Sequence, residues 1–193
     1  VRFPITSGPL AGKASLLVWT TTPWTLVSNT AVAAHPDVTY VVASDGEETL
    51  VLAEPLAEKV LGEGWMLGQT FPGKALEYWR YDRPFELVDF PDVVGGTHYV
   101  LMADYVTTED GTGLVHEAPA FGEDDMITCR AYGLPMVNPI NPDGTFAETV
   151  PLVGGLFFKT ADKILVQDLE ERGLLFRELP YEHSYPHCWR CDT

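Results

Sequence analysis

Short stretches of alternating or continuous apolar residues, rich in Val, Thr and aromatic side chains, occupy most of the first 110 residues. Gly, Pro and Asp interrupt these stretches every few residues, which is the pattern of β-strands joined by turns. Asp45-Gly46 separates two of them and predicts an antiparallel hairpin. The predicted strands are residues 15–20, 31–34, 38–43, 48–53, 66–70, 76–81 and 98–106.

Helical signals are fewer and lie mainly in the second half of the chain. Each predicted helix is followed by a glycine, which commonly ends a helix in the left-handed conformation. The predicted helices are residues 54–61, 123–132 and 160–172, and a last strand is expected at 174–178. Because strands dominate without regular helical alternation, we expect a mixed α+β fold with a β-barrel-like core of mostly antiparallel strands and a few packed helices.

Composition narrows the class of protein. The 193 residues are 46% hydrophobic, which is enough for one packed domain. Apolar runs of about 18 uncharged residues are missing, so we expect no membrane span. The three cysteines are too few for a disulfide framework, which favours a reducing compartment and a cytoplasmic location. The chain starts at Val1 with no signal-peptide pattern, as expected of a segment of a longer protein.

The net charge is −16, from 28 acidic and 12 basic residues. This balance disfavours independent, charge-driven binding to a phosphate backbone, which needs clustered Lys and Arg. The sequence also lacks the G-x-S-x-G elbow of serine hydrolases and the glycine-rich loop of P-loop proteins. Serine nucleophile chemistry and nucleotide hydrolysis are therefore excluded.

Two segments have unusual chemistry, and the first is WTTTPWTL at residues 19–26, followed by Asn29. Pro23 ends regular strand pairing there and keeps Thr22 extended. The loop offers several hydroxyl groups beside indole rings, which suits a small substrate that carries hydroxyls. The alternative is that threonine and tryptophan are simply good strand residues.

The second segment is GTGLVHEAPAFGEDD at residues 111–125, where a strand leads to His116 and three acids begin a helix. Acids in a first helical turn are favoured by the helix dipole, and a histidine at a strand end is often a packing residue. Three acids together exceed that need. One of them is therefore a candidate to bind a cationic group such as an α-ammonium.

Together, the two segments resemble the editing domain that is inserted in isoleucyl-tRNA synthetase, often called connective peptide one (CP1). The resemblance assigns residues 1–180 to an editing domain and 181–193 to a C-terminal segment that re-enters the synthetase body. Valyl and leucyl relatives carry a charged Arg-Pro-Glu-Thr or Arg-Pro-Asp-Thr in place of the Thr22–Thr25 tetrapeptide. Trp24 thus favours the isoleucyl branch, with the valyl or leucyl branch as the alternative.

The resemblance implies hydrolytic proofreading. Valine lacks one methylene of isoleucine, which a pocket discriminates by only about 1–3 kcal/mol, a limit for which isoleucyl-tRNA synthetase is the standard example. The expected reaction is hydrolysis of the ester of Val-tRNA(Ile) by a positioned water, while isoleucine is excluded sterically. Valyl-adenylate is a further candidate substrate. The expected partners are the 3′ acceptor end of tRNA(Ile) carrying valine and the rest of the synthetase chain. We expect a monomer, and no cofactor in the editing site.

The resemblance also implies roles for individual residues, with Thr22, Asp125 and His116 as the catalytic candidates. Asp125 is expected to bind the α-ammonium of the substrate. His116 is expected to form the pocket wall and to hydrogen-bond the terminal ribose. Thr22 is expected to orient the ester and the water, so that positioning replaces a strong general base. The expected substrate-binding residues are Thr20, Thr21, Trp24, Thr25 and Asn29.

The sequence ends in a Cys188-x-x-Cys191 pair, the spacing of half a zinc knuckle. A closed zinc site needs four ligands, and His183 or His187 could complete one locally. The resemblance instead implies an incomplete half-site that holds zinc only in the intact synthetase. A redox pair is a third interpretation. If the cluster were the functional centre, the chain would be a zinc-stabilised interaction module rather than an enzyme.

Overall fold

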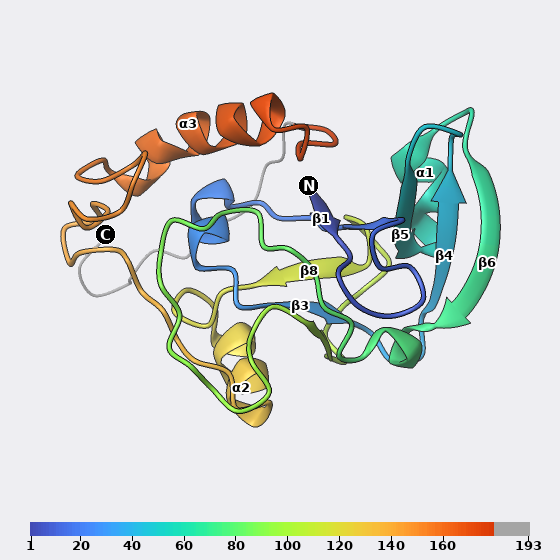
Figure 1. The fold of residues 1–193 in the computed structure, drawn as a ribbon, viewed down its shortest axis with the longest axis horizontal. Helices are drawn as coiled ribbons and strands as arrows, with labels where there is room; N and C mark the ends of the chain where they lie inside the picture. The colour runs from blue at the N-terminus through green and yellow to red at the C-terminus, as the bar shows by residue number, and fades with distance from the viewer. Residues whose placement is uncertain (180–193) are drawn as a thin grey trace.

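The computed structural model describes residues 1–179. The predicted re-entry segment and the cysteine pair, Cys188 and Cys191, lie outside the described residues. Two β-sheets form the body of the described chain, with helices packed around them (Figure 1).

The larger sheet has five strands in the order β1-β2-β5-β4-β6. The predicted hairpin around Asp45-Gly46 is confirmed, because β4 and β5 pair antiparallel with Val42 opposite Val51. A short 3-10 turn, η2 (Glu54–Leu56), leads into helix α1 (Ala57–Leu61), whose buried residues pack on this sheet. The strands are β1 (Arg2–Pro4), β2 (Ser15–Leu17), β4 (Thr39–Ser44), β5 (Thr49–Ala53) and β6 (Met66–Pro72).

The smaller sheet has the order β7-β3-β8 and carries the second unusual segment. Its strands are β3 (Ala31–Ala34), β7 (Val100–Met102) and β8 (Leu114–Glu117). β3 and β8 run antiparallel, with Val32 opposite His116. This register brings His116 beside the chain that leaves the Thr-rich loop, and the two strands lie side by side in Figure 1.

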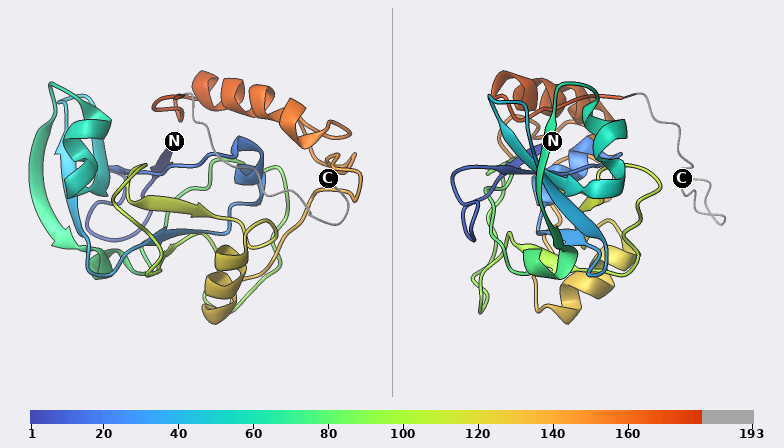
Figure 2. Two further views of the ribbon diagram at one scale, coloured as in Figure 1. Left: turned by 180° about the vertical axis from the view of Figure 1, so that it is seen from behind. Right: turned by 90° about the vertical axis from the view of Figure 1, so that its right-hand side faces the viewer.

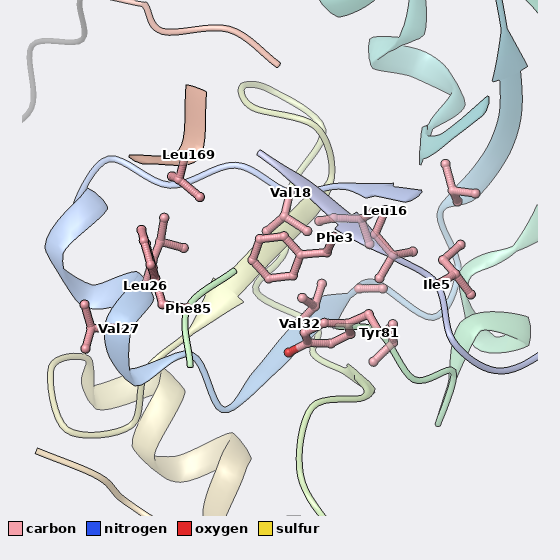
Figure 3. Packing of buried hydrophobic residues seen from close by; sticks show 14 of the residues in the cluster. Phe3, Ile5, Leu16, Val18, Leu26, Val27, Val32, Tyr81, Phe85 and Leu169 are labelled. Atoms are coloured by element: carbon pink, nitrogen blue, oxygen red, sulfur yellow. The ribbon is translucent and has the colours of Figure 1, made fainter. Parts of the chain in front are cut away.

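The Thr-rich segment continues into a 3-10 helix, η1 (Pro23–Ser28), and helix α3 (Phe158–Glu171) packs across it (Figures 1 and 2). Leu165 and Leu169 of α3 are buried in the main hydrophobic cluster. Figure 3 shows Leu169 above η1 and the ring of Phe3 beside Val18 and Tyr81. The remaining helices are η3 (Gly73–Leu76) and α2 (Glu123–Ala131).

The prediction of a strand-dominated mixed α+β fold is confirmed, and four of the six strand pairings within the two sheets are antiparallel. No closed barrel is found among residues 1–179: the named strands form two open sheets, and isolated bridges between Trp19 and Val115, Ile5 and Tyr81, and Arg80 and Tyr99 connect them. No strand spans the predicted stretch 76–81, because η3 ends at Leu76 and Tyr78 has a φ of 65°, which extended pairing does not allow; only Arg80 and Tyr81 form isolated bridges, with Tyr99 and Ile5. The stretch 98–106 contributes only β7, and 174–178 forms no strand.

None of the helices within residues 1–179 is long and apolar enough to cross a membrane.

Candidate functional site

The Thr-rich loop is organised by hydrogen bonds among its own hydroxyls. Thr22 immediately precedes η1, with an extended φ of −130°, and its N–H donates to Thr20 Oγ1 at 3.1 Å. Thr25 Oγ1 donates to the carbonyl oxygen of Thr22 at 2.8 Å, and the hydroxyl oxygens of Thr22 and Thr25 are 2.9 Å apart. The loop therefore presents half-buried hydroxyls in fixed positions at the start of η1.

His116 lies directly behind this loop. Its side chain is 6% exposed, and Nε2 is 3.0 Å from Thr25 Oγ1 while Nδ1 is 2.8 Å from Asn29 Nδ2. Burial lowers the pKa of His116 to about 3, so the ring is neutral at pH 7. Both ring nitrogens are engaged within the protein, so the predicted hydrogen bond from His116 to a ribose has no free nitrogen to make it.

Asn29 lies deeper in the protein than His116, and its side chain is hydrogen-bonded within the protein. It is 1% exposed, and its amide nitrogen donates to the carbonyl oxygen of Ala31 at 2.9 Å as well as to His116. Its amide oxygen accepts from the phenol of Tyr81 at 2.8 Å. Asn29, which the sequence suggests as a substrate-binding residue, instead supports His116 from within the protein. Tyr81, which the sequence did not single out, holds Asn29 in this position.

Asp125 is the third residue of α2, and its carboxylate turns back to the loop that precedes the helix. Oδ2 accepts from the N–H of Ala118 at 2.8 Å. Gly122 lies so close that a Cβ there would be 2.5 Å from Oδ1. Burial raises the pKa of Asp125 above its ordinary value, although the bond from Ala118 opposes this. Asp125 therefore fixes the 118–122 loop and remains partly accessible.

Trp24 joins the two segments. Its ring packs edge-on against Phe121 of the 118–122 loop, with centroids 4.7 Å apart, and against Phe158 of α3 at 4.6 Å. Its backbone N–H donates to Asp162 Oδ1 at 2.7 Å. Burial raises the pKa of Asp162 to about 6. The structure thus brings together the two segments singled out in the sequence, through Trp24 with Phe121 and through His116 with Thr25.

Glu117 is a buried acid that sequence reasoning also missed. Its side chain is 0% exposed, and Oε2 accepts from the phenol of Tyr105 at 2.6 Å. Oε1 is buried and has no hydrogen-bond partner among the described residues. Burial, and after it the charge of the nearby Asp125, raises the pKa of Glu117 to about 8, so the acid is mainly protonated at pH 7.

A cavity of about 930 Å³ lies between the Thr-rich loop and α3. Thr20, Thr21 and Asp162 line it, whereas His116 and Asp125 do not. Within the described part of the chain, no three His, Cys, Asp or Glu side chains cluster in a way that could hold a metal ion. The two segments offer threonine hydroxyls in fixed positions and the carboxylate of Asp125. Among residues 1–179, His116 has no free ring nitrogen to activate a nucleophile in these segments.

Known proteins with similar sequences are isoleucine–tRNA ligases. The chain is 74% identical over its whole length to the enzyme of Streptomyces coelicolor, 69% to that of Thermobifida fusca and 49% to that of Thermus thermophilus. The chain spans about 18% of the length of each of these relatives. No protein-family model matches the chain.

Solved structures with a similar fold are editing domains of leucyl-tRNA synthetases. The CP1 domain of one leucyl-tRNA synthetase aligns with a TM-score of 0.68 at 15% identity, over 94% of this chain and 98% of that one. The editing domain of the P. falciparum cytosolic leucyl-tRNA synthetase aligns with a TM-score of 0.60 at 10% identity, over 83% and 78% of the two chains. The chain is therefore homologous along its whole length to a segment of isoleucine–tRNA ligase, and it has the fold of a synthetase CP1 editing domain.

Proposed function

We propose that the chain is a hydrolytic editing domain that removes valine from Val-tRNA(Ile), with valyl-adenylate as a further candidate substrate. The observation that carries this proposal is the junction of the two segments: Trp24 contacts Phe121 in the 118–122 loop, to which the Asp125 carboxylate of α2 is hydrogen-bonded, and His116 contacts Thr25 beside the Thr-rich loop. An aminoacyl ester has a cationic α-ammonium group beside an activated carbonyl. The carboxylate of Asp125 can bind the ammonium, and the threonine hydroxyls can orient the carbonyl.

In this mechanism, Asp125 binds the α-ammonium by a charge-assisted hydrogen bond. Thr20, Thr21 and Thr22 orient the ester and the attacking water. The ring of His116 cannot take a proton from that water, because Asn29 occupies Nδ1 and Thr25 occupies Nε2. An ester is already an activated acyl group, so a water in the correct geometry is sufficient for hydrolysis without a covalent enzyme intermediate.

The charge of the chain shapes how the tRNA is delivered. With a net charge of −16, the chain binds a polyanion weakly by itself, and the rest of the synthetase presents the acceptor end of the tRNA. A cytoplasmic location, a monomeric state and a zinc site completed at Cys188 and Cys191 by the intact synthetase are further parts of this proposal.

The proposal is tested by incubating Val-tRNA(Ile) with the chain and following the loss of the ester. Asp125→Ala is expected to slow deacylation by about 100-fold, which corresponds to losing nearly 3 kcal/mol of interaction with the ammonium. Asp124→Ala is the matched control, because Asp124 is an exposed acid at the preceding position of the same helix. It should keep the parental rate. Equal rates for the parent and Asp125→Ala would contradict the proposal.

A further inference from the structure

A continuous chain of hydrogen bonds runs from the interior to the Thr-rich loop. The phenol of Tyr81 donates to Asn29 Oδ1 at 2.8 Å, and Asn29 Nδ2 lies 2.8 Å from His116 Nδ1. His116 Nε2 lies 3.0 Å from Thr25 Oγ1, which lies 2.9 Å from Thr22 Oγ1. The first four residues are at most 6% exposed, and only Thr22 at the end is half-buried.

The chemistry of the acceptors fixes the direction of every bond in this chain. A carbonyl oxygen only accepts, so the atom of Asn29 that faces the Ala31 carbonyl is the amide nitrogen. The second hydrogen of this amide then points at His116 Nδ1, which must be unprotonated. The proton of the neutral ring is therefore on Nε2, and Nε2–H donates to Thr25 Oγ1.

The same reasoning extends to the end of the chain. Thr25 has one hydroxyl proton, which it donates to the Thr22 carbonyl at 2.8 Å. The hydroxyl of Thr22 must therefore donate to Thr25 Oγ1. This arrangement keeps the oxygen of Thr22 as an acceptor toward other groups. An acceptor at this position can take a hydrogen bond from a water and leave the lone pair of that water free for attack.

We propose that Tyr81 and Asn29 are positioning residues of the editing site, which act through His116 to hold Thr22 as a hydrogen-bond acceptor for the attacking water. This inference rests on the proposed hydrolytic function. It concerns residues that do not contact the substrate, since Tyr81 is 3% exposed and lies three hydrogen bonds from Thr25.

The first test is spectroscopic and needs no substrate. In ¹⁵N-labelled protein at pH 7, the ring nitrogens of His116 should report a neutral ring protonated at Nε2. A ring protonated at Nδ1, or at both nitrogens, would overturn the proposal. If the wild-type chain fails to hydrolyse Val-tRNA(Ile), the proposed function fails, whereas this spectrum still decides whether the hydrogen-bond chain is correct.

The second test compares two tyrosines that differ in their link to the loop. Tyr81→Phe removes the donor to Asn29, and Tyr40→Phe removes an equally buried phenol that donates to the Gly113 carbonyl at 2.6 Å. Tyr81→Phe should lower kcat for Val-tRNA(Ile) by about tenfold or more with KM unchanged, because the water is misplaced while binding persists. Tyr40→Phe should leave kcat unchanged, since Tyr40 is not part of the chain of hydrogen bonds that leads to Thr22.

Parental kcat in Tyr81→Phe, or an equal fall in both variants, would overturn the positioning role. Should Tyr81→Phe fail to fold, Asn29→Asp tests the same chain of hydrogen bonds by spectroscopy. An ionised carboxylate at position 29 can only accept a hydrogen bond, so it cannot donate to His116 Nδ1 as Asn29 does. Its partner, His116 Nδ1, should then become protonated. An unprotonated Nδ1 in Asn29→Asp, with the new carboxyl ionised in the ¹³C spectrum, would show that the two side chains are not hydrogen-bonded, and would equally overturn the proposal.

Discussion

Replacing Glu117 by glutamine should change how the stability of the chain depends on pH. Glu117 is 0% exposed, and one of its oxygens has no partner among residues 1–179. Ionising this carboxyl in the folded state is therefore costly, and its pKa rises from 4.5 to about 8. Glutamine has a similar shape and cannot ionise, so it removes this cost and keeps an oxygen for the phenol of Tyr105.

The sign and size of the effect follow from proton linkage. An acid whose pKa is higher in the folded state binds more protons when folded, so the free energy of unfolding falls as pH rises from 4.5 to about 8. A one-unit difference in pKa corresponds to about 1.4 kcal/mol. Between pH 5 and pH 8, Glu117 should therefore reduce the free energy of unfolding by about 3 kcal/mol.

The assay is urea unfolding of the parent and Glu117→Gln at pH 5 and pH 8, followed by tryptophan fluorescence. The difference in unfolding free energy between the two proteins cancels the titration of other groups, including His116. That difference should shift by about 3 kcal/mol in favour of the variant at the higher pH. Glu123→Gln, an exposed carboxyl at the start of α2, is the control and should show no such shift. A difference that is the same at both pH values would show that Glu117 has no raised pKa in the folded protein.

Three further predictions concern packing and charge. Gly113→Ala should destabilise the fold by about 2 kcal/mol or more in urea unfolding, because φ is 73° and the new Cβ would lie 2.4 Å from the Cβ of Ala53. Gly133→Ala, at a φ of 71° with open space around it, should cost only about 1 kcal/mol; equal losses would refute the clash. Trp24→Ala should lower stability by about 2 kcal/mol and slow deacylation, because the aromatic contact between the loops is lost; parental values of both would contradict that role. Asp125→Asn should preserve the circular dichroism spectrum, since its amide oxygen can still accept the hydrogen bond from Ala118. It should raise KM for Val-tRNA(Ile) about tenfold or more, because the negative charge is lost. An unchanged KM would show that Asp125 does not bind the ammonium.

Features with a local cause were predictable from the sequence. The hairpin around Asp45-Gly46 and the helix that begins at Glu123 are each determined by residues within a few positions, and both are confirmed. The two unusual segments were also recognisable, because their residue types are rare in combination. Their junction through Trp24 and Phe121 agrees with a common site.

Features that depend on distant contacts were not predictable. Tyr81 reaches Asn29 across 52 positions, and nothing in the local sequence marks either residue as buried beneath the loop. The stretch 76–81 has the composition of a strand, yet the left-handed backbone at Tyr78 overrides that propensity. The burial of Glu117 follows from the pairing of β8 with β3, which the alternation of residues alone does not specify.

Hydrolytic editing by this chain is tested by comparing two esters under identical conditions. The chain, in excess, is incubated separately with Val-tRNA(Ile) and Ile-tRNA(Ile), and the first-order loss of each ester is corrected for spontaneous hydrolysis. The valyl ester should be hydrolysed at least about 100-fold faster, because the larger side chain of isoleucine is excluded from the site rather than bound more weakly. Equal rates for the two esters, or no loss of the valyl ester above background, would contradict this expectation.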